Sequence, residues 1–133
     1  TSRSMRDVRL GLDVRDFIRA NFATRDLDAD SIADRFGLSR STLYRQFATD
    51  GGVHAYIRER RLRHAVRLLR MPGTRQRVSS VAYACGFADE HSFSRAFKAR
   101  FGVSPRDAKA GEVDTARLHE GEELTAWIQN LEG

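Results

Sequence analysis

The stretch Gly86–Pro105, GFADEHSFSRAFKARFGVSP, decides the fold of this 133-residue chain. Asp89 is a good N-cap, because its side-chain oxygen can accept hydrogen bonds from the free amides of a first helical turn. Phe93, Phe97 and Phe101 recur every four residues, which predicts an amphipathic helix with one apolar stripe. We therefore expect a rigidly held helix that turns long polar side chains towards a polar partner. These side chains belong to Glu90, His91, Ser94, Arg95 and Lys98.

The same pattern occurs earlier in the chain, offset by 49 residues before the turn and by 50 after it. Each copy consists of two short helical segments joined by a turn that contains glycine, which is typical of a helix-turn-helix. The chain therefore contains an internal duplication of this motif. The matched segments are Ile32-Ala33 and Val81-Ala82, Phe36-Gly37-Leu38 and Cys85-Gly86-Phe87, and Leu43-x-Arg45-x-Phe47 and Phe93-x-Arg95-x-Phe97.

Periodicity and capping residues predict the remaining helices. Glycine after a helix and proline at its first position supply further boundaries, at Gly37 and Pro105. The predicted helices are Val8–Phe22; Ser31–Phe36, capped by Asp30 or Ser31; Arg40–Ala48, capped by Ser39; Val53–Met71; a helix ending at Cys85, capped by Ser79 or Ser80; the helix after Asp89; and a short one from Pro105.

The predicted fold is all-α, with two helix-turn-helix subdomains (8–52 and 72–110) joined by a long linker helix (53–71). Residues 1–7 are interpreted as an N-terminal extension or an expression remnant. Residues 111–133 form an acidic tail, for which we expect a C-terminal amphipathic helix that either docks on the domain or forms a dimer contact. Its apolar spacing is carried by Leu124, Trp127, Ile128 and Leu131.

Charge is distributed unevenly along the chain, whose formal net charge is +5. Residues 112–133 sum to −5, so that residues 1–111 carry +10. A basic body with an acidic tail favours a polyanionic partner, nucleic acid first and an anionic membrane surface second. A solvated basic surface without such a partner is the alternative.

Several classes of protein lack support in the sequence. Cys85 is the single cysteine, so an internal disulfide framework is excluded and a reducing compartment is favoured. Cys85 is interpreted as a core residue, with a redox-sensing thiol as the alternative. No apolar run could span a bilayer and no secretory signal is visible. No metal-ligand spacing, cofactor motif or nucleophile motif occurs, so we expect neither metal nor cofactor and no enzyme.

Three motifs carry a resemblance to a known family. Ser41-x-x-x-Arg45-x-Phe47, Arg61-Leu62-x-x-Ala65-x-x-Leu68-Leu69 and the stretch 86–105 resemble the DNA-binding domain of AraC/XylS-type transcriptional regulators, over about residues 8–109. The resemblance implies a bacterial regulator with seven helices, acting on double-stranded DNA in the cytoplasm at the nucleoid. The chain departs from the family pattern at Ala48, where a basic residue is usual, and at Ala108 and Lys109, where Tyr and Arg are usual.

The recognition helices are expected at about 40–48 and 89–101, each entering one of two successive major grooves. Arginine can donate two parallel hydrogen bonds to guanine, which favours Arg95 and its twin Arg45 as base readers. The alternative for Arg45 is an ion pair with Asp34. Glu90 either accepts from cytosine or only favours the helix N-terminus, and His91 either reads a base or caps locally. The expected base contacts are Ser41, Tyr44, Arg45, Glu90, His91, Ser94 and Arg95; the expected phosphate contacts are Ser39, Arg40, Lys98 and Arg106.

The expected partners are double-stranded DNA and RNA polymerase, with no membrane. Two reading helices in one chain favour a monomeric DNA-binding unit; dimerisation through the C-terminal tail or through a domain outside this sequence is the alternative. A helical protein-interaction adaptor that reuses the fold without selecting a DNA sequence is the main competing function.

Overall fold

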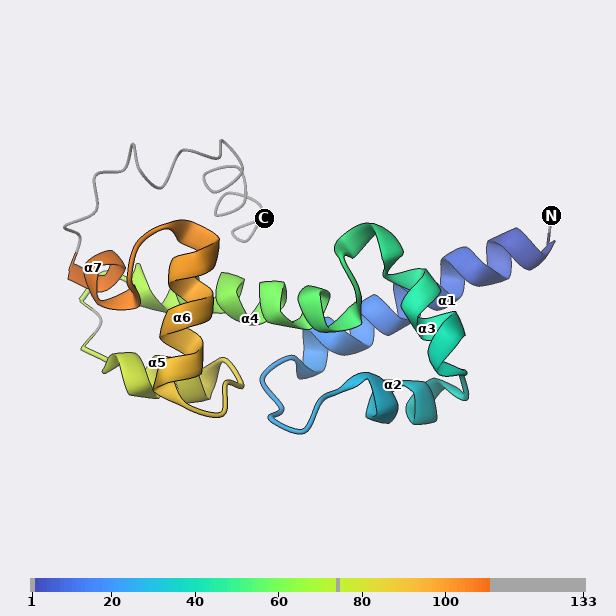
Figure 1. Ribbon diagram of the computed structural model, residues 1–133, viewed down its shortest axis with the longest axis horizontal. Helices are drawn as coiled ribbons and strands as arrows, with labels where there is room; N and C mark the ends of the chain where they lie inside the picture. The colour runs from blue at the N-terminus through green and yellow to red at the C-terminus, as the bar shows by residue number, and fades with distance from the viewer. Residues whose placement is uncertain (1, 74, 111–133) are drawn as a thin grey trace. The chain divides into compact units, whose positions relative to one another are not determined.

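The computed structural model describes residues 2–73 and 75–110, in which the regular structure is helical and no strand occurs. This agrees with the predicted all-α class. The chain forms two compact units, and the boundary between them falls inside one helix, between Arg61 and Leu62. In chain order the elements are α1 (Ser2–Asn21), α2 (Ala29–Phe36), α3 (Arg40–Gln46), the 3-10 turn η1 (Ala48–Asp50), α4 (Val53–Leu69), α5 (Val78–Ala84), α6 (Glu90–Phe101) and α7 (Pro105–Ala110), labelled in Figure 1.

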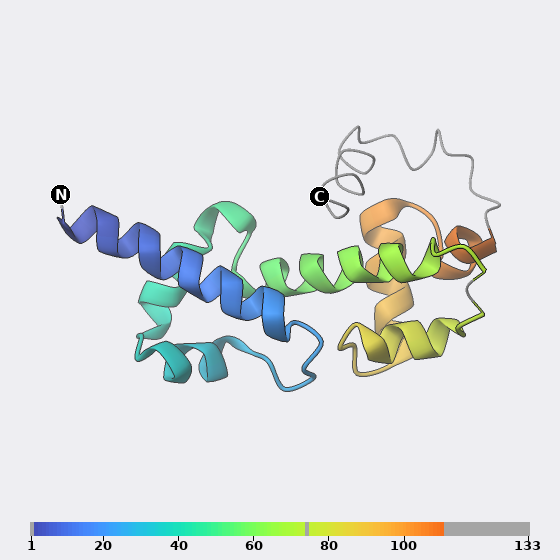
Figure 2. The same ribbon diagram turned by 180° about the vertical axis from the view of Figure 1, so that it is seen from behind.

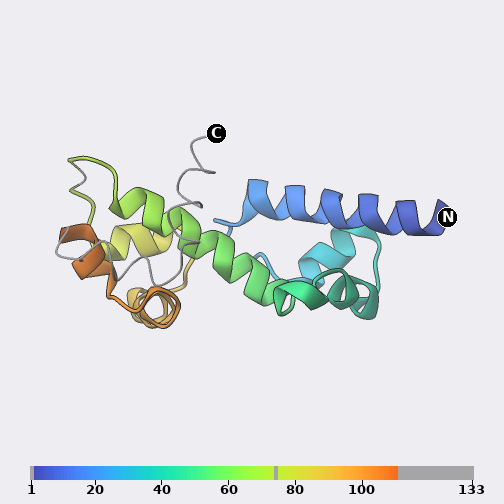
Figure 3. The same cartoon turned by 90° about the horizontal axis from the view of Figure 1, so that it is seen from above.

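The first unit is built around a core that α1 shares with the first helix-turn-helix. Figure 2 shows α1 lying across the pair of α2 and α3, and Figure 3 shows the same pairing from above. Burial of apolar side chains from each helix drives this packing. The core side chains with no exposed area are Val14, Ile18, Ile32, Leu43, Phe47 and Val53.

α1 is longer than the sequence predicted, because it begins at Ser2 rather than at Val8. Gln46 of α3 donates a hydrogen bond from Nε2 to the main-chain oxygen of Asp7, at 3.1 Å. Gly11 permits this approach, since a Cβ atom there would lie 2.6 Å from Oε1 of Gln46. The first turns of α1 are thereby tied to the first helix-turn-helix.

The start of α2 differs from the prediction, because Asp28 and not Asp30 or Ser31 is its N-cap. Oδ1 of Asp28 accepts from the amide of Ser31 at 2.8 Å, and the Ser31 hydroxyl accepts from the amide of Asp28 at 3.1 Å. This reciprocal capping box satisfies two amides that a cap at either later position would leave open. Gly37 ends α2 with φ +64°, as predicted.

α3 begins after Ser39, as predicted, but ends at Gln46 and not at Ala48. The chain then tightens into η1 and turns at Gly51, where φ is +80°. α4 follows as one continuous helix that ends at Leu69, slightly before the predicted Met71.

The second unit packs α5, α6 and α7 with the residues of α4 from Leu62 on. In Figure 1, α6 crosses α4 and α5 lies beneath it. The Phe stripe of α6 is buried as predicted, with ring centroids 5.7 Å apart between Phe93 and Phe97 and 4.8 Å between Phe97 and Phe101. Cys85 is also fully buried in this core, as the core interpretation expected.

Two further boundaries bear on the sequence predictions. α5 starts two or three residues earlier than expected, after Arg77 rather than after Ser79 or Ser80, and no side chain caps it. α7 starts at Pro105 as predicted. Lys109 donates to the main-chain oxygen of Gln76, which fastens α7 to the loop before α5 despite the missing aromatic residue. The predicted tail helix lies outside the described residues.

Candidate nucleic-acid interface

The first candidate reading helix, α3, is held at both ends. Gly37 reverses the chain after α2, and the amide of Leu38 donates to the carbonyl of Ala33 at 2.9 Å. Ser39 then caps α3, since its Oγ accepts from the amide of Thr42 at 3.2 Å. Leu43 and Phe47 are fully buried, so that the rotation of the helix about its axis is determined by the core.

This packing leaves the predicted base contacts of α3 exposed. Ser41, Tyr44 and Arg45 are all exposed, and Tyr44 shows 42% of its surface, which is unusual for a large aromatic side chain. The alternative ion pair of Arg45 with Asp34 is not formed, and among the described residues the Arg45 side chain has no hydrogen-bond or ion-pair partner. Its guanidinium is available to an external acceptor.

The predicted phosphate contacts of α3 are engaged within the protein. The hydroxyl of Ser39 is used by the cap and by Thr42. Arg40 donates from Nε to Oδ1 of Asp30 at 2.6 Å, across the turn of the motif. This hydrogen bond, with the charge of Asp30, raises the pKa of the Arg40 guanidinium above its usual value. Both side chains are more than 60% exposed, so that the pair is solvent-screened and weak.

The second candidate reading helix, α6, has the same construction with a stronger cap. Oδ1 of Asp89 accepts from the amide of Ser92 at 2.7 Å. This backbone hydrogen bond, followed by that of the Ser92 side chain, lowers the pKa of the Asp89 carboxyl below its usual value. The nearby charge of His91 adds to the shift. The N-terminal end of α6 is therefore well fixed at neutral pH.

The predicted contacts of the second unit are five residues of α6 and one residue at the start of α7. Glu90, His91, Arg95 and Lys98 are exposed, and Ser94 is partly buried between them. Residues spaced by three or four on a helix are surface neighbours, so that His91, Ser94, Arg95 and Lys98 form one continuous strip. Arg106 is exposed on α7.

Equivalent positions of the two helices are chemically unequal. Among the outward-facing positions only the arginine is retained, as Arg45 in α3 and Arg95 in α6, and neither has a partner among the described residues. The position of Arg40 in the first copy is taken by Glu90 in the second, which reverses the charge at the start of the helix. Further differences are that Ser41, Tyr44 and Ala48 of the first copy correspond to His91, Ser94 and Lys98 of the second.

One supporting residue, Arg15, was missed by the sequence reading. From α1 it donates through Nη2 to the main-chain oxygen of Gln46 at 3.0 Å and to Oδ2 of Asp50 at 2.7 Å. Its guanidinium also stacks on the Phe47 ring, 4.5 Å from the centroid. A lone arginine in an amphipathic helix gives no signal of such contacts, since its partners lie more than 30 residues away.

Neither a metal centre nor a membrane span is found in the part of the chain that the structure describes. Within residues 2–73 and 75–110, no group of three His, Cys, Asp or Glu side chains could hold a metal ion. None of the helices described is long and apolar enough to cross a membrane.

Comparison with known proteins identifies the family. The family model of a helix-turn-helix domain matches residues 32–111, which is more than half of the chain. The transcriptional activator RhaS of Escherichia coli is 39% identical over 88 residues, which cover 65% of this chain and 31% of RhaS. The chain therefore spans less than two thirds of this relative.

Solved structures show the same fold. The C-terminal domain of AraT, a response regulator from Geobacillus stearothermophilus, superposes with a TM-score of 0.70 at 26% identity, covering 77% of this chain and 84% of that domain. A regulator with an AraC-type DNA-binding domain from Chromobacterium violaceum gives a TM-score of 0.64 at 27% identity, covering 83% and 95%. With the duplicated motif and its two equivalent arginines, these matches show that the chain belongs to the AraC/XylS-type helix-turn-helix family.

Proposed function

We propose that this chain is the DNA-binding part of a sequence-specific transcriptional regulator, in which α3 and α6 each enter a major groove. The observation that carries the proposal is the pair of exposed, unpartnered arginines at equivalent positions of two capped helices, Arg45 and Arg95. The likeness to RhaS, which is named as a transcriptional activator, supports it.

The base contacts follow from the exposed strips. Arginine can donate in parallel to O6 and N7 of guanine, and a good bidentate pair of this kind is worth about 1–3 kcal/mol of discrimination. Arg45 and Arg95 are the principal readers in this proposal. Ser41, Tyr44, His91 and Ser94 lie beside them on the same faces, and Glu90 reads cytosine N4 as an acceptor.

The phosphate contacts position the helices without selecting a sequence. Lys98 and Arg106 are exposed cations of the second unit. Arg40 is the corresponding phosphate contact of the first unit. Its guanidinium can exchange the carboxylate of Asp30 for a phosphate oxygen, because an exposed ion pair is worth only about 0–1 kcal/mol. Ser39 contributes from the N-terminal end of α3, where the helix dipole favours an anion.

Two reading helices in one chain can address two successive boxes of an operator, so that the monomer is the DNA-binding unit. RNA polymerase is the proposed protein partner, acting at the nucleoid in the bacterial cytoplasm. The protein has no enzymatic role in this proposal; its output is the occupancy of a site.

Selection of bound sequences from a pool of random duplexes tests the proposal. The expected result is enrichment of two short boxes, each with a conserved guanine, that is lost box by box in Arg45→Ala and Arg95→Ala. A pool that shows no enrichment over several rounds would contradict the proposal and favour an adaptor that binds protein. Binding should also fall steeply with added salt, since phosphate contacts release counterions.

A further inference from the structure

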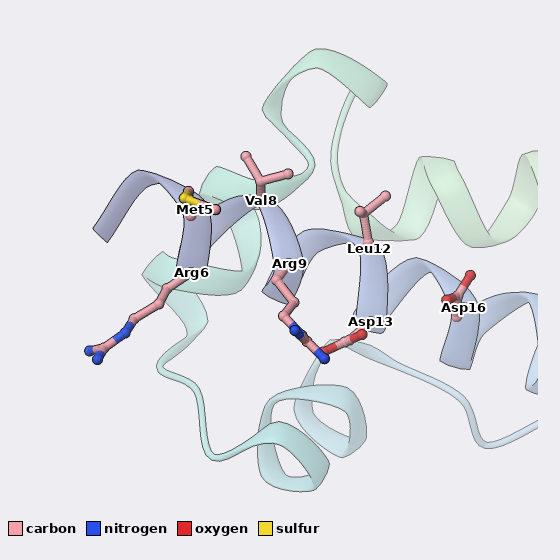
Figure 4. A pocket seen from close by; sticks show the side chains of 7 residues that line it. All are labelled: Met5, Arg6, Val8, Arg9, Leu12, Asp13 and Asp16. Atoms are coloured by element: carbon pink, nitrogen blue, oxygen red, sulfur yellow. The ribbon is translucent and has the colours of Figure 1, made fainter. Parts of the chain in front are cut away.

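The outer face of α1 carries an apolar stripe that the described part of the chain does not cover. Met5, Val8 and Leu12 are exposed by 74%, 62% and 55%, which places them among the most exposed large apolar side chains of the described residues. Their spacing of three and four residues aligns them in one row, as Figure 4 shows. An exposed apolar row on an otherwise well-packed helix indicates an interaction surface.

Four charged side chains lie along one flank of this row. Arg6 and Arg9 come from the N-terminal half of α1, and Asp13 and Asp16 from the following turns. At 100° per residue all four fall on the same side of the apolar stripe. The flank is therefore positive at one end and negative at the other.

We propose that this face pairs with the same face of a second copy of the chain, as two antiparallel α1 helices related by a two-fold axis. In such a pair each flank faces the identical flank of the partner, since the two-fold axis runs perpendicular to both helices. An axis level with Gly11 places Arg9 opposite Asp13 of the second copy and Arg6 opposite Asp16. The charged flank then complements itself at all four positions.

The same register brings the apolar rows together. Val8 lies close to the level of Leu12 of the second copy, and Leu12 close to Val8, so that the two side chains interleave across the axis. A parallel pair would instead place the charged flank of each helix against the apolar row of the other. The sequence of the stripe thus favours one orientation through both its charges and its apolar side chains.

The contact is small. Stable specific interfaces bury about 1,200–2,000 Å² in total, and one exposed helical row supplies less than this. We therefore expect a weak dimer that forms at micromolar or higher concentrations. None of the predicted DNA contacts belongs to this face, so the proposed pairing does not use them.

Charge exchange at Arg9 and Asp13 tests the proposal. Asp16 is left unchanged, because it also pairs with Arg19 of its own helix. In Arg9→Glu, two acidic side chains face each other across the axis, and in Asp13→Arg two basic ones do. Sedimentation equilibrium of the 133-residue chain should show each single variant weakened by at least about tenfold, because like charges now oppose each other.

The decisive measurement mixes the two single variants. In the mixed pair the two introduced side chains, an acid and a base, face each other, and the unmodified Asp13 of one chain faces the unmodified Arg9 of the other. The mixture should therefore associate to within about threefold of the unmodified chain, as should the double variant. Arg58→Glu, an equal charge change on an exposed residue of α4, is the matched control and should leave association unchanged. Far-UV circular dichroism checks that helix content is retained.

Two outcomes would overturn the proposal. One is an unmodified chain that stays monomeric up to millimolar concentration, in which case a different partner covers the stripe. The other is self-association that survives in both single variants, or that the mixture fails to restore.

Discussion

Arg15 of α1 donates a hydrogen bond to the main-chain oxygen of Gln46, the last residue of α3, at 3.0 Å. The same guanidinium contacts Asp50 and stacks on Phe47. It satisfies a carbonyl at the C-terminal end of a helix, where a cation is also favoured by the helix dipole. One side chain thereby joins α1 to the end of the first candidate reading helix.

Arg15→Ala should destabilise the first unit by about 2–3 kcal/mol, because a charged hydrogen bond and a cation–π contact are lost together and a carbonyl is left open. Urea unfolding measures the loss. Arg19→Ala is the matched control on the same helix: its pair with Asp16 is exposed and should be worth about 1 kcal/mol or less. If the two substitutions lowered the free energy of unfolding equally, the contacts of Arg15 would contribute no more than an exposed ion pair.

Phe47→Leu and Phe97→Leu are substitutions at equivalent positions of the two copies. The two phenylalanine side chains lie in separate cores. Each should cost about 1–2 kcal/mol, since apolar contact area is lost within a packed interior. Hydrogen exchange followed by mass spectrometry should show faster exchange mainly in the unit that carries the substitution. Uniform acceleration along the whole chain would instead show that the units unfold as one.

Arg95→Ala should cost about 1–3 kcal/mol on the preferred operator and little on random DNA, because base readout is lost while phosphate contacts remain. Lys98→Ala, one turn further along α6, should weaken binding to every duplex and reduce the salt slope by about 1. Gel-shift titrations at several salt concentrations separate the two. If Arg95→Ala lost the same affinity on random duplexes as on the operator, Arg95 would contact the DNA backbone and not a base.

Asp30→Asn should tighten binding to all duplexes. It removes the charged internal partner of Arg40, and it removes a negative charge that would repel the DNA phosphate proposed to bind Arg40. The gain should be several-fold at low salt and disappear at high salt. Fluorescence anisotropy with an unrelated duplex measures it, and unchanged affinity would mean that Arg40 does not meet a phosphate.

Asp89→Asn should remove one source of acid sensitivity. Hydrogen bonds from Ser92 lower the pKa of the Asp89 carboxyl below its usual 3.8, so its stabilisation is complete above that value and is lost as the pH falls through the lowered pKa. Asparagine caps as well as aspartate at neutral pH but does not titrate. The unfolding temperature should therefore be unchanged near neutral pH and fall less steeply below 3.8 than in the unmodified chain, as followed by circular dichroism.

Local signals in the sequence predicted most of the fold. Ser39, Asp89, Gly37 and Pro105 each mark a boundary, because caps, left-handed turns and first-turn prolines depend on a single residue and its neighbours. The start of α2 could not be read in this way. Several polar residues close together are able to cap a helix there, and the reciprocal bond between Asp28 and Ser31 selects among them only in three dimensions.

The candidate site was predicted to the extent that exposure follows helical periodicity. Arg45 and Arg95 lie on outer faces because Phe47 and Phe97 anchor the opposite sides in equivalent ways. The engagement of Arg40 with Asp30 was not predictable, since it spans ten residues and depends on how the turn folds back. The exposure of Met5 on a helix was not predicted either, because the sequence pattern assigns that residue to an extension before the helix.

Under the proposed function, the charge reversal between Arg40 and Glu90 has a consequence for how the protein is oriented on a promoter. α3 opens with Arg40, a cation held by Asp30, and α6 opens with Glu90, an exposed carboxylate. Under the proposed function Glu90 reads a base and Arg40 a phosphate, so we expect the two boxes to differ at this position. We then expect the protein to bind in one orientation along the duplex, so that the order of the two boxes determines which of its surfaces points upstream.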